Sequence, residues 1–81
     1  MNVELIHGEF SPKDAIDILT QMVHVKIRFH EGKINNQGKS EDVKMRENRI
    51  KQLQRDLYEA RKFIDAQTGR ISINGGIELI G

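Results

Sequence analysis

The sequence has no cysteine, and Pro12 is its only proline among 81 residues. Without cysteine the chain can form neither a disulfide nor a thiolate nucleophile, which is compatible with a reducing compartment. A single domain of this length buries only about 60% of the surface that its unfolded chain exposes, so its stability is marginal. Oligomerisation is a common remedy, and we expect contacts between chains to matter here.

Neither sign of charge is in excess, and no long apolar run is present. Thirteen lysines and arginines face twelve acidic residues, so net charge does not favour binding to nucleic acid or to an anionic membrane. Residues 15–29, the most apolar stretch, are interrupted by charged and polar residues and fall well short of a membrane span. Residues 1–8 lack the pattern of a signal peptide. We expect one cytoplasmic domain, residues 1–81, with no membrane association.

The first long helix is predicted over residues 12–33. Ser11 can accept a hydrogen bond from a free amide, Pro12 suits the first helical position, and Asp14 opposes the positive end of the helix dipole. Apolar residues recur at spacings of three and four along two adjacent stripes. The first stripe is Ala15, Ile18, Met22, Val25 and Phe29, and the second is Ile16, Leu19, Val23, Ile27 and Ile34.

A loop is predicted over residues 34–40 and a second helix over residues 41–67. Ser40 is the expected capping residue, and such a short loop implies antiparallel helices. The second helix has a single narrow apolar seam, made of Val43, Ile50, Leu53, Leu57, Ala60 and Ile64. The first helix therefore has more apolar surface than its partner can cover. It needs a third element, which is either a sheet or a second copy of the chain.

Short strands are predicted at both ends of the hairpin. Residues 3–7 alternate, with Val3, Leu5 and His7 on one face, and residues 70–80 change from helical to strand periodicity. The pair Gly75-Gly76 leaves two alternatives, a tight turn that makes a C-terminal hairpin or a bulge within one longer strand. We prefer the bulge because the first arm of such a hairpin would be very short.

These elements predict an α+β fold of β-α-α-β order, in which a long antiparallel helical hairpin is flanked by two short, antiparallel terminal strands. We expect two copies to pack as a homodimer, because two hairpins could bury the second stripe of the first helix together. The candidate self-association residues are Ile16, Leu19, Val23 and Ile27. The alternative is that this stripe packs against the sheet of the same chain.

Residues that could support catalysis or metal binding are few. His24 and His30 are six residues apart and do not share a helix face, and Asp14 and Asp17 are explained by the helix dipole. The glycine pair is not followed by a helix, so it does not fit a phosphate-binding loop. We therefore expect no catalytic residues, no metal and no cofactor, and enzyme activity is the distant alternative.

One face of the second helix has a basic character. Its candidate nucleic-acid-binding residues are Lys44, Lys51, Arg55, Tyr58 and Lys62. Such a row could follow a phosphate backbone, with Tyr58 as a stacking group. Acidic residues on adjoining faces, such as Glu47 and Glu59, give this helix the mixed charge of a solvated face, and we favour that interpretation.

Four segments together resemble a group of small bacterial proteins of β-α-α-β pattern that have no assigned function. They are residues 8–15, 25–30, 49–53 and 71–74, which read GEFSPKDA, VKIRFH, RIKQL and ISIN. The resemblance spans nearly the whole chain and implies a stand-alone bacterial protein. It implies no activity, cofactor or partner.

The sequence thus favours a non-enzymatic protein-interaction or structural protein that acts as a homodimer, with an unidentified protein as a second kind of partner. The alternative function is nucleic-acid binding or regulation through the basic face of the second helix.

Overall fold

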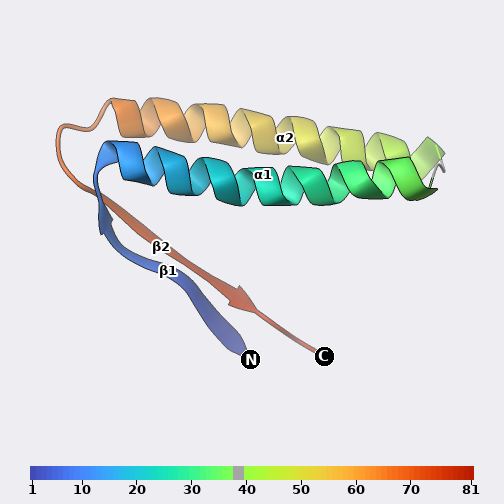
Figure 1. Ribbon diagram of the computed structural model, residues 1–81, viewed down its shortest axis with the longest axis horizontal. Coiled ribbons are helices and arrows are strands. Elements are labelled where there is room, and N and C mark those ends of the chain that lie inside the picture. The colour runs from blue at the N-terminus through green and yellow to red at the C-terminus, as the bar shows by residue number, and fades with distance from the viewer. Residues whose placement is uncertain (38–39) are drawn as a thin grey trace.

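The computed structural model describes residues 1–37 and 40–81, with side chains for 1–35 and 41–81. In this part the chain order is β1 (Asn2–Phe10), α1 (Pro12–Gln37), α2 (Ser40–Asp65) and β2 (Ile71–Glu78). The helices lie side by side and antiparallel, and both strands leave the same end of the hairpin (Figure 1). The predicted α+β class with β-α-α-β order is confirmed.

Helix α1 begins where the sequence predicts and ends later. The Asp14 amide donates to Ser11 Oγ at 3.1 Å, so Ser11 caps the helix as expected. The predicted loop 34–40 is wrong for residues 34–37, which continue α1. Gly32 costs only about 1 kcal/mol within a helix, and the half-buried Ile34 adds one more turn of apolar contact. Residues 38–39 lie outside the described residues.

Helix α2 spans residues 40–65 rather than the predicted 41–67. The Gln67 amide donates to the Ile64 carbonyl at 3.1 Å, a spacing of three residues that tightens and ends the last turn. The predicted capping role of the Ser40 side chain lies outside the described side chains.

The two strands form one antiparallel sheet. Strand β2 is continuous, so the alternative of a C-terminal hairpin is wrong. The irregularity lies on the partner strand: Glu4 pairs with Gly76 and Ile6 pairs with Gly75, which leaves Leu5 as an extra residue in β1. The bulge is therefore opposite the glycines rather than within them.

This extra residue decides which side chains share a face of the sheet. Directly paired residues of antiparallel strands point to the same side. One face carries the apolar residues Val3, Ile6, Phe10, Ile71, Ile73 and Ile77, and the other carries Glu4, His7, Glu9, Ser72, Asn74 and Glu78. In a regular strand Val3 and Ile6 would lie on opposite faces. The predicted grouping of Val3 with His7 is wrong for this reason.

The core lies where the sheet joins the hairpin. Ala15, Ile64 and Ile71 form its buried centre. Partly buried side chains pack around them, namely Phe10, Ile16, Leu19 and Ile73. This cluster therefore joins α1, α2 and both strands at the end of the hairpin where the sheet begins.

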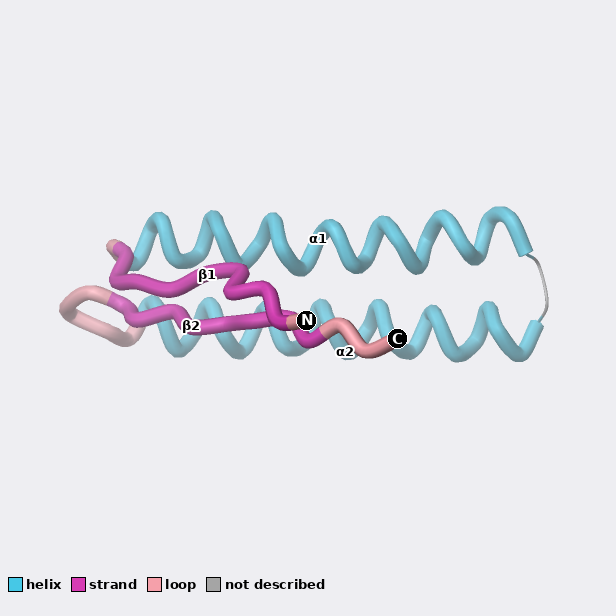
Figure 2. Tube along the Cα trace, turned by 90° about the horizontal axis from the view of Figure 1, so that it is seen from below, coloured by secondary structure: helices cyan, strands magenta, loops and turns pink. Residues whose placement is uncertain are grey.

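Away from this end the sheet diverges from the helices. Figure 1 shows the strands descending from the hairpin as one arm of a V, and Figure 2 shows them running beneath the helix pair. The chain measures 46 × 31 × 13 Å along its principal axes. Contacts between the sheet and α1 are thus concentrated near the join.

Candidate interaction surfaces

The predicted self-association residues are already engaged within the chain. Ile16 and Leu19 pack against the core cluster, Val23 is half-buried, and Ile27 is 9% exposed. Their spacing places all four on one face of α1. Ile27 also lines the groove between the helices together with Leu57 of α2. This face of α1 is the one that the second helix covers.

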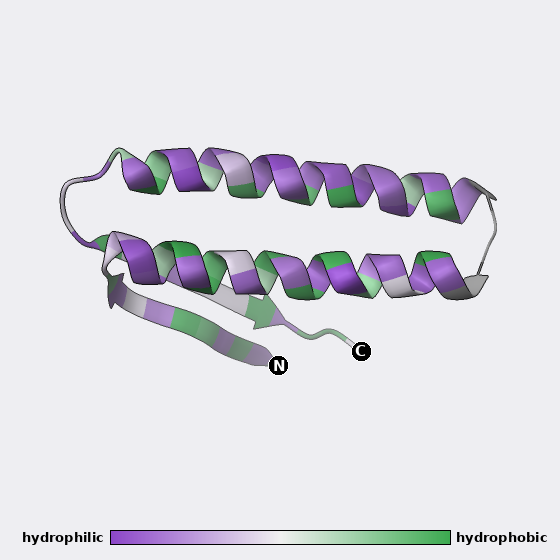
Figure 3. Ribbon diagram, turned by 45° about the horizontal axis from the view of Figure 1, so that its top comes forward, coloured by the Kyte–Doolittle hydropathy of each residue, from purple (hydrophilic) through white to green (hydrophobic). Residues whose placement is uncertain are grey.

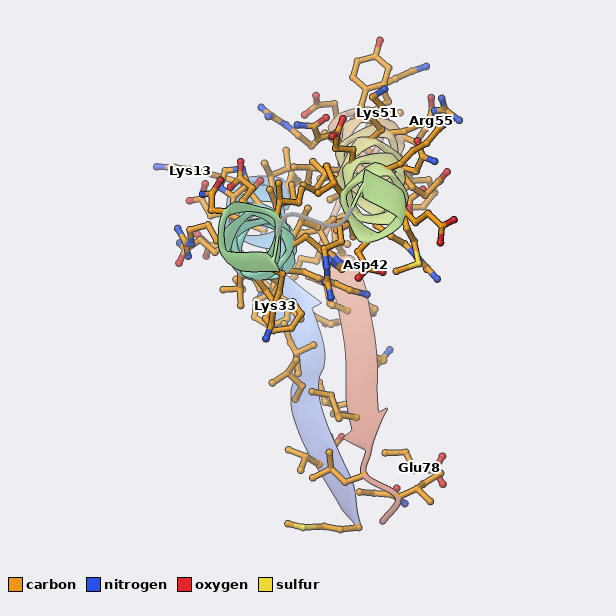
Figure 4. The ribbon with its side chains drawn as sticks, turned by 90° about the vertical axis from the view of Figure 1, so that its right-hand side faces the viewer. Lys13, Lys33, Asp42, Lys51, Arg55 and Glu78 are labelled. Carbon is orange, nitrogen blue, oxygen red and sulfur yellow. The ribbon has the colours of Figure 1, made fainter. Side chains whose placement is uncertain are left out.

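The neighbouring stripe of α1 is the one left exposed. We define the outer stripe as Met22, Val25 and Phe29, whose side chains are 36%, 61% and 57% exposed. The Lys33 ammonium lies 5.7 Å from the centre of the Phe29 ring. Lys33 extends on the side of α1 that faces the sheet (Figure 4). Phe29 therefore lies on the side of α1 next to the space between α1 and the sheet, and its spacing from Met22 and Val25 puts all three on one helix face.

The apolar face of the sheet, which we name the sheet wall, is the other side of this space. Near the join its residues are buried, as Ile71 shows. Further out, Val3 and Ile77 are exposed, and beyond the strands Met1, Leu79 and Ile80 are more exposed still. Apolar segments are concentrated on α1 and the strands, whereas α2 is mostly hydrophilic (Figure 3). Both walls of the V are thus apolar and largely uncovered.

The backbone at the free end of the sheet is nevertheless well paired. The Met1 amine donates to the Leu79 carbonyl at 2.9 Å, and the Leu79 amide donates to the Met1 carbonyl at 2.7 Å. These bonds continue the ladder one step beyond β1 and β2. The exposed apolar end is therefore held as an ordered strand pair.

The candidate nucleic-acid-binding residues lie on the opposite side of the molecule. All five are exposed, and Figure 4 shows Lys51 and Arg55 pointing away from the sheet. Lys62 already makes contacts within α2: its ammonium lies 3.8 Å from a Glu59 carboxylate oxygen and 5.2 Å from the Tyr58 ring centre. These exposed contacts are individually weak.

A groove of about 670 Å³ runs between the helices next to this basic face. Tyr58 and Lys62 line it from α2, and Arg28 lines it from α1. Glu31 and Asp65 also line it, so its charge is mixed. The groove extends the basic row across to the first helix, but it has the charge balance of a solvated surface.

A polar contact between the helices joins His30 to Arg46. An Arg46 Nη1 donates to His30 Nδ1 at 3.0 Å. His30 Nε2 and Arg46 Nε are buried and make no hydrogen bond with the described residues. Burial, and then the positive charges of Arg46, Lys26 and Arg49, hold the pKa of His30 below its usual value of 6.5. The neutral imidazole is therefore the form that fits this site.

Within residues 1–37 and 40–81, no group of three or more His, Cys, Asp or Glu side chains is placed to hold a metal ion. His7 lies on the polar face of the sheet, 3.7 Å from a Glu4 oxygen, whereas His24 lines the groove and His30 pairs with Arg46. The three histidines are thus in three separate environments. Neither described helix is long and apolar enough to cross a membrane.

Sequence reasoning missed the outer stripe as a candidate surface because both stripes of α1 are apolar. Which stripe meets α2 depends on the rotation of α1 about its own axis, and the periodicity alone does not specify this angle. One available signal was the bulk of Phe29 between Lys26 and Lys33, which suits a rim more than a tight helix seam.

Comparison of the chain with known protein families, with curated proteins and with solved structures gave no match.

Proposed function

We propose that this chain is a non-enzymatic structural or protein-interaction protein that acts as a homodimer. The observation that carries the proposal is the amount of surface that a single copy leaves in water. Its accessible surface is 6471 Å². A compact monomer of 9.3 kDa is expected to expose about 5,000 Å². One copy thus leaves about 1,500 Å² more than its mass requires.

The dimensions support the same conclusion. The radius of gyration is 15.2 Å. A compact domain of 81 residues is expected to have a value of about 12 Å. The buried apolar residues within the described part of the chain are only Ala15, Ile27, Ile64 and Ile71. So small a core is typical of a chain that completes its burial with a partner.

The excess exposed surface also has the size and the apolar character of a homodimer interface. A stable interface of standard size buries about 800 Å² on each partner, and homodimer interfaces are more apolar than ordinary surfaces. Exposed large apolar side chains occur on α1, on both strands and beyond them, for example at Val25, Ile77 and Ile80. A second copy of the chain could bury this exposed apolar surface against its own.

Multi-angle light scattering across a concentration series tests this proposal. We expect a mass of twice 9.3 kDa at micromolar concentrations and above, with dissociation on dilution. A mass of 9.3 kDa that persists at several hundred micromolar would refute the homodimer. The measurement needs only the unmodified chain.

The second candidate function is nucleic-acid binding along α2. It is favoured by the exposure of all five predicted residues, with Arg28 extending the row across the groove. Titration of labelled single- and double-stranded DNA and RNA at about 50 and 200 mM salt tests it. Affinity should fall steeply with salt and should weaken further in Lys51→Glu. Absence of salt-dependent binding would eliminate this candidate.

A further inference from the structure

We infer that the surface by which two copies associate is the inside of the V, formed by the sheet wall and the outer stripe of α1, and that its occupant is the same surface of a second copy. This inference rests on the proposed homodimer and specifies its interface. We place the interface here rather than on the face of α1 that contains Val23, because that face is already packed within the chain.

Each wall of the V carries several exposed apolar side chains, such as Val25 on α1 and Val3 and Ile77 on the sheet. The sheet has its polar residues on the reverse face, where His7 and Glu4 lie within 3.7 Å of each other. On α1 the outer stripe is bordered on one side by the exposed polar residues Arg28 and Asp17. Water is therefore unfavourable inside the V and favourable outside it.

The bulge in β1 strengthens this inference. Inserting Leu5 moves Val3 to the same side as Ile6 and the buried core, so the apolar face continues to the free end of the sheet. Without the bulge the outer half of β1 would present Glu4 to the inside of the V. The chain thus keeps an apolar face over a length where its own helices do not cover it.

A second copy is the occupant because the surface can meet itself. A twofold axis places the same patch on both partners, so an interface needs one surface that is complementary to its own image. The V presents two apolar walls joined at one end, so the sheet of one copy and the outer stripe of the other can share the same interior. The excess of about 1,500 Å² per chain is more than the roughly 800 Å² that each partner of a standard interface contributes.

The experiment compares three Val→Glu or Tyr→Glu variants by light scattering and by circular dichroism. Val25→Glu places a charge on the outer stripe, at a site 61% exposed in one copy. Tyr58→Glu places the same charge on the far side of the hairpin, at a site 62% exposed. Val23→Glu, two residues from the first site, places it on the face of α1 that is packed within the chain.

We expect Val25→Glu to raise the dimer dissociation constant about 100-fold or more, because a twofold interface receives the buried charge from both copies. Tyr58→Glu should remain dimeric with the unmodified dissociation constant. Val23→Glu should lose helical signal at all concentrations, since it disrupts packing inside each copy. This pattern of three results would support the V as the interface.

The measurements distinguish failure of the proposed homodimer from failure of the inferred interface. If the unmodified chain is monomeric, the proposed homodimer is wrong, and the inferred interface fails with it. If the unmodified chain is dimeric and Val25→Glu dimerises equally well, the homodimer stands and the V is refuted as its interface. If Val25→Glu fails to fold, Ile77→Glu on the sheet wall decides: dissociation supports the inference, and an unchanged dissociation constant refutes it.

Discussion

Truncation of Ile64 to alanine tests whether the stability of the chain depends on its small core. Ile64 is 4% exposed and lies in the buried cluster with Ala15 and Ile71. The substitution removes three carbon atoms from this site, each worth about 0.8 kcal/mol on burial, and leaves a cavity whose lining loses contacts. We expect a loss of roughly 3 kcal/mol in the free energy of unfolding.

That loss is large for a chain of this size. Domains are typically stable by about 0.05–0.15 kcal/mol per residue, which gives roughly 4–12 kcal/mol for 81 residues. A cost of about 3 kcal/mol therefore removes from a quarter to most of the stability and lowers Tm by roughly 12–24 °C. Urea denaturation followed by circular dichroism, at one fixed protein concentration, measures the change.

Phe63→Ala is the matched control. Phe63 is the residue next to Ile64 on α2, it is larger, and it is 63% exposed. Its truncation should cost less than about 1 kcal/mol, because most of that side chain is in water already. If Phe63→Ala costs as much as Ile64→Ala, the reasoning from burial is wrong and the core lies elsewhere.

Two further predictions concern the ends and the seam of the hairpin. Ser11→Ala should lower the free energy of unfolding, measured in urea, by about 1 kcal/mol, because the Asp14 amide loses its acceptor. Ser11→Thr should retain most of this stability, since threonine also caps helices. An equal loss in both variants would argue against capping. Because the pKa of His30 is held low by burial and nearby positive charge, the unfolded chain binds more protons, so stability should fall as pH drops below about 6.5. His30→Gln should flatten the dependence of Tm on pH, and His24→Gln should not. Equal profiles for both variants would refute the conclusion that His30 causes this pH dependence.

The sequence alone was enough for the order of the elements. Capping by Ser11, the first turn at Pro12 and the helical spacing that follows are local signals, and the structure has them as predicted. The change of period after residue 69 likewise predicted the last strand. Element ends were less certain, because continuing α1 from residue 33 to Gln37 depends on small differences in propensity and contact.

Of the candidate surfaces, one could be predicted from the sequence and one could not. The basic face of α2 follows from helix geometry, so its five residues are exposed as the spacing predicts. Which apolar stripe of α1 is exposed does not follow, because both adjacent stripes are apolar and the choice depends on the rotation of the helix about its axis. The structure turns Ile27 towards α2 and leaves Val25 outside.

What the sequence by itself determined is the α+β class, the β-α-α-β order and the excess of apolar surface on the first helix, because each depends on periodicity and local signals. Only the tertiary structure decided that Leu5 is the bulged residue and that Val25 stays exposed while Ile27 is buried. Strand register and helix rotation are set by contacts between residues far apart in the chain. Such contacts leave no periodic trace in either partner alone.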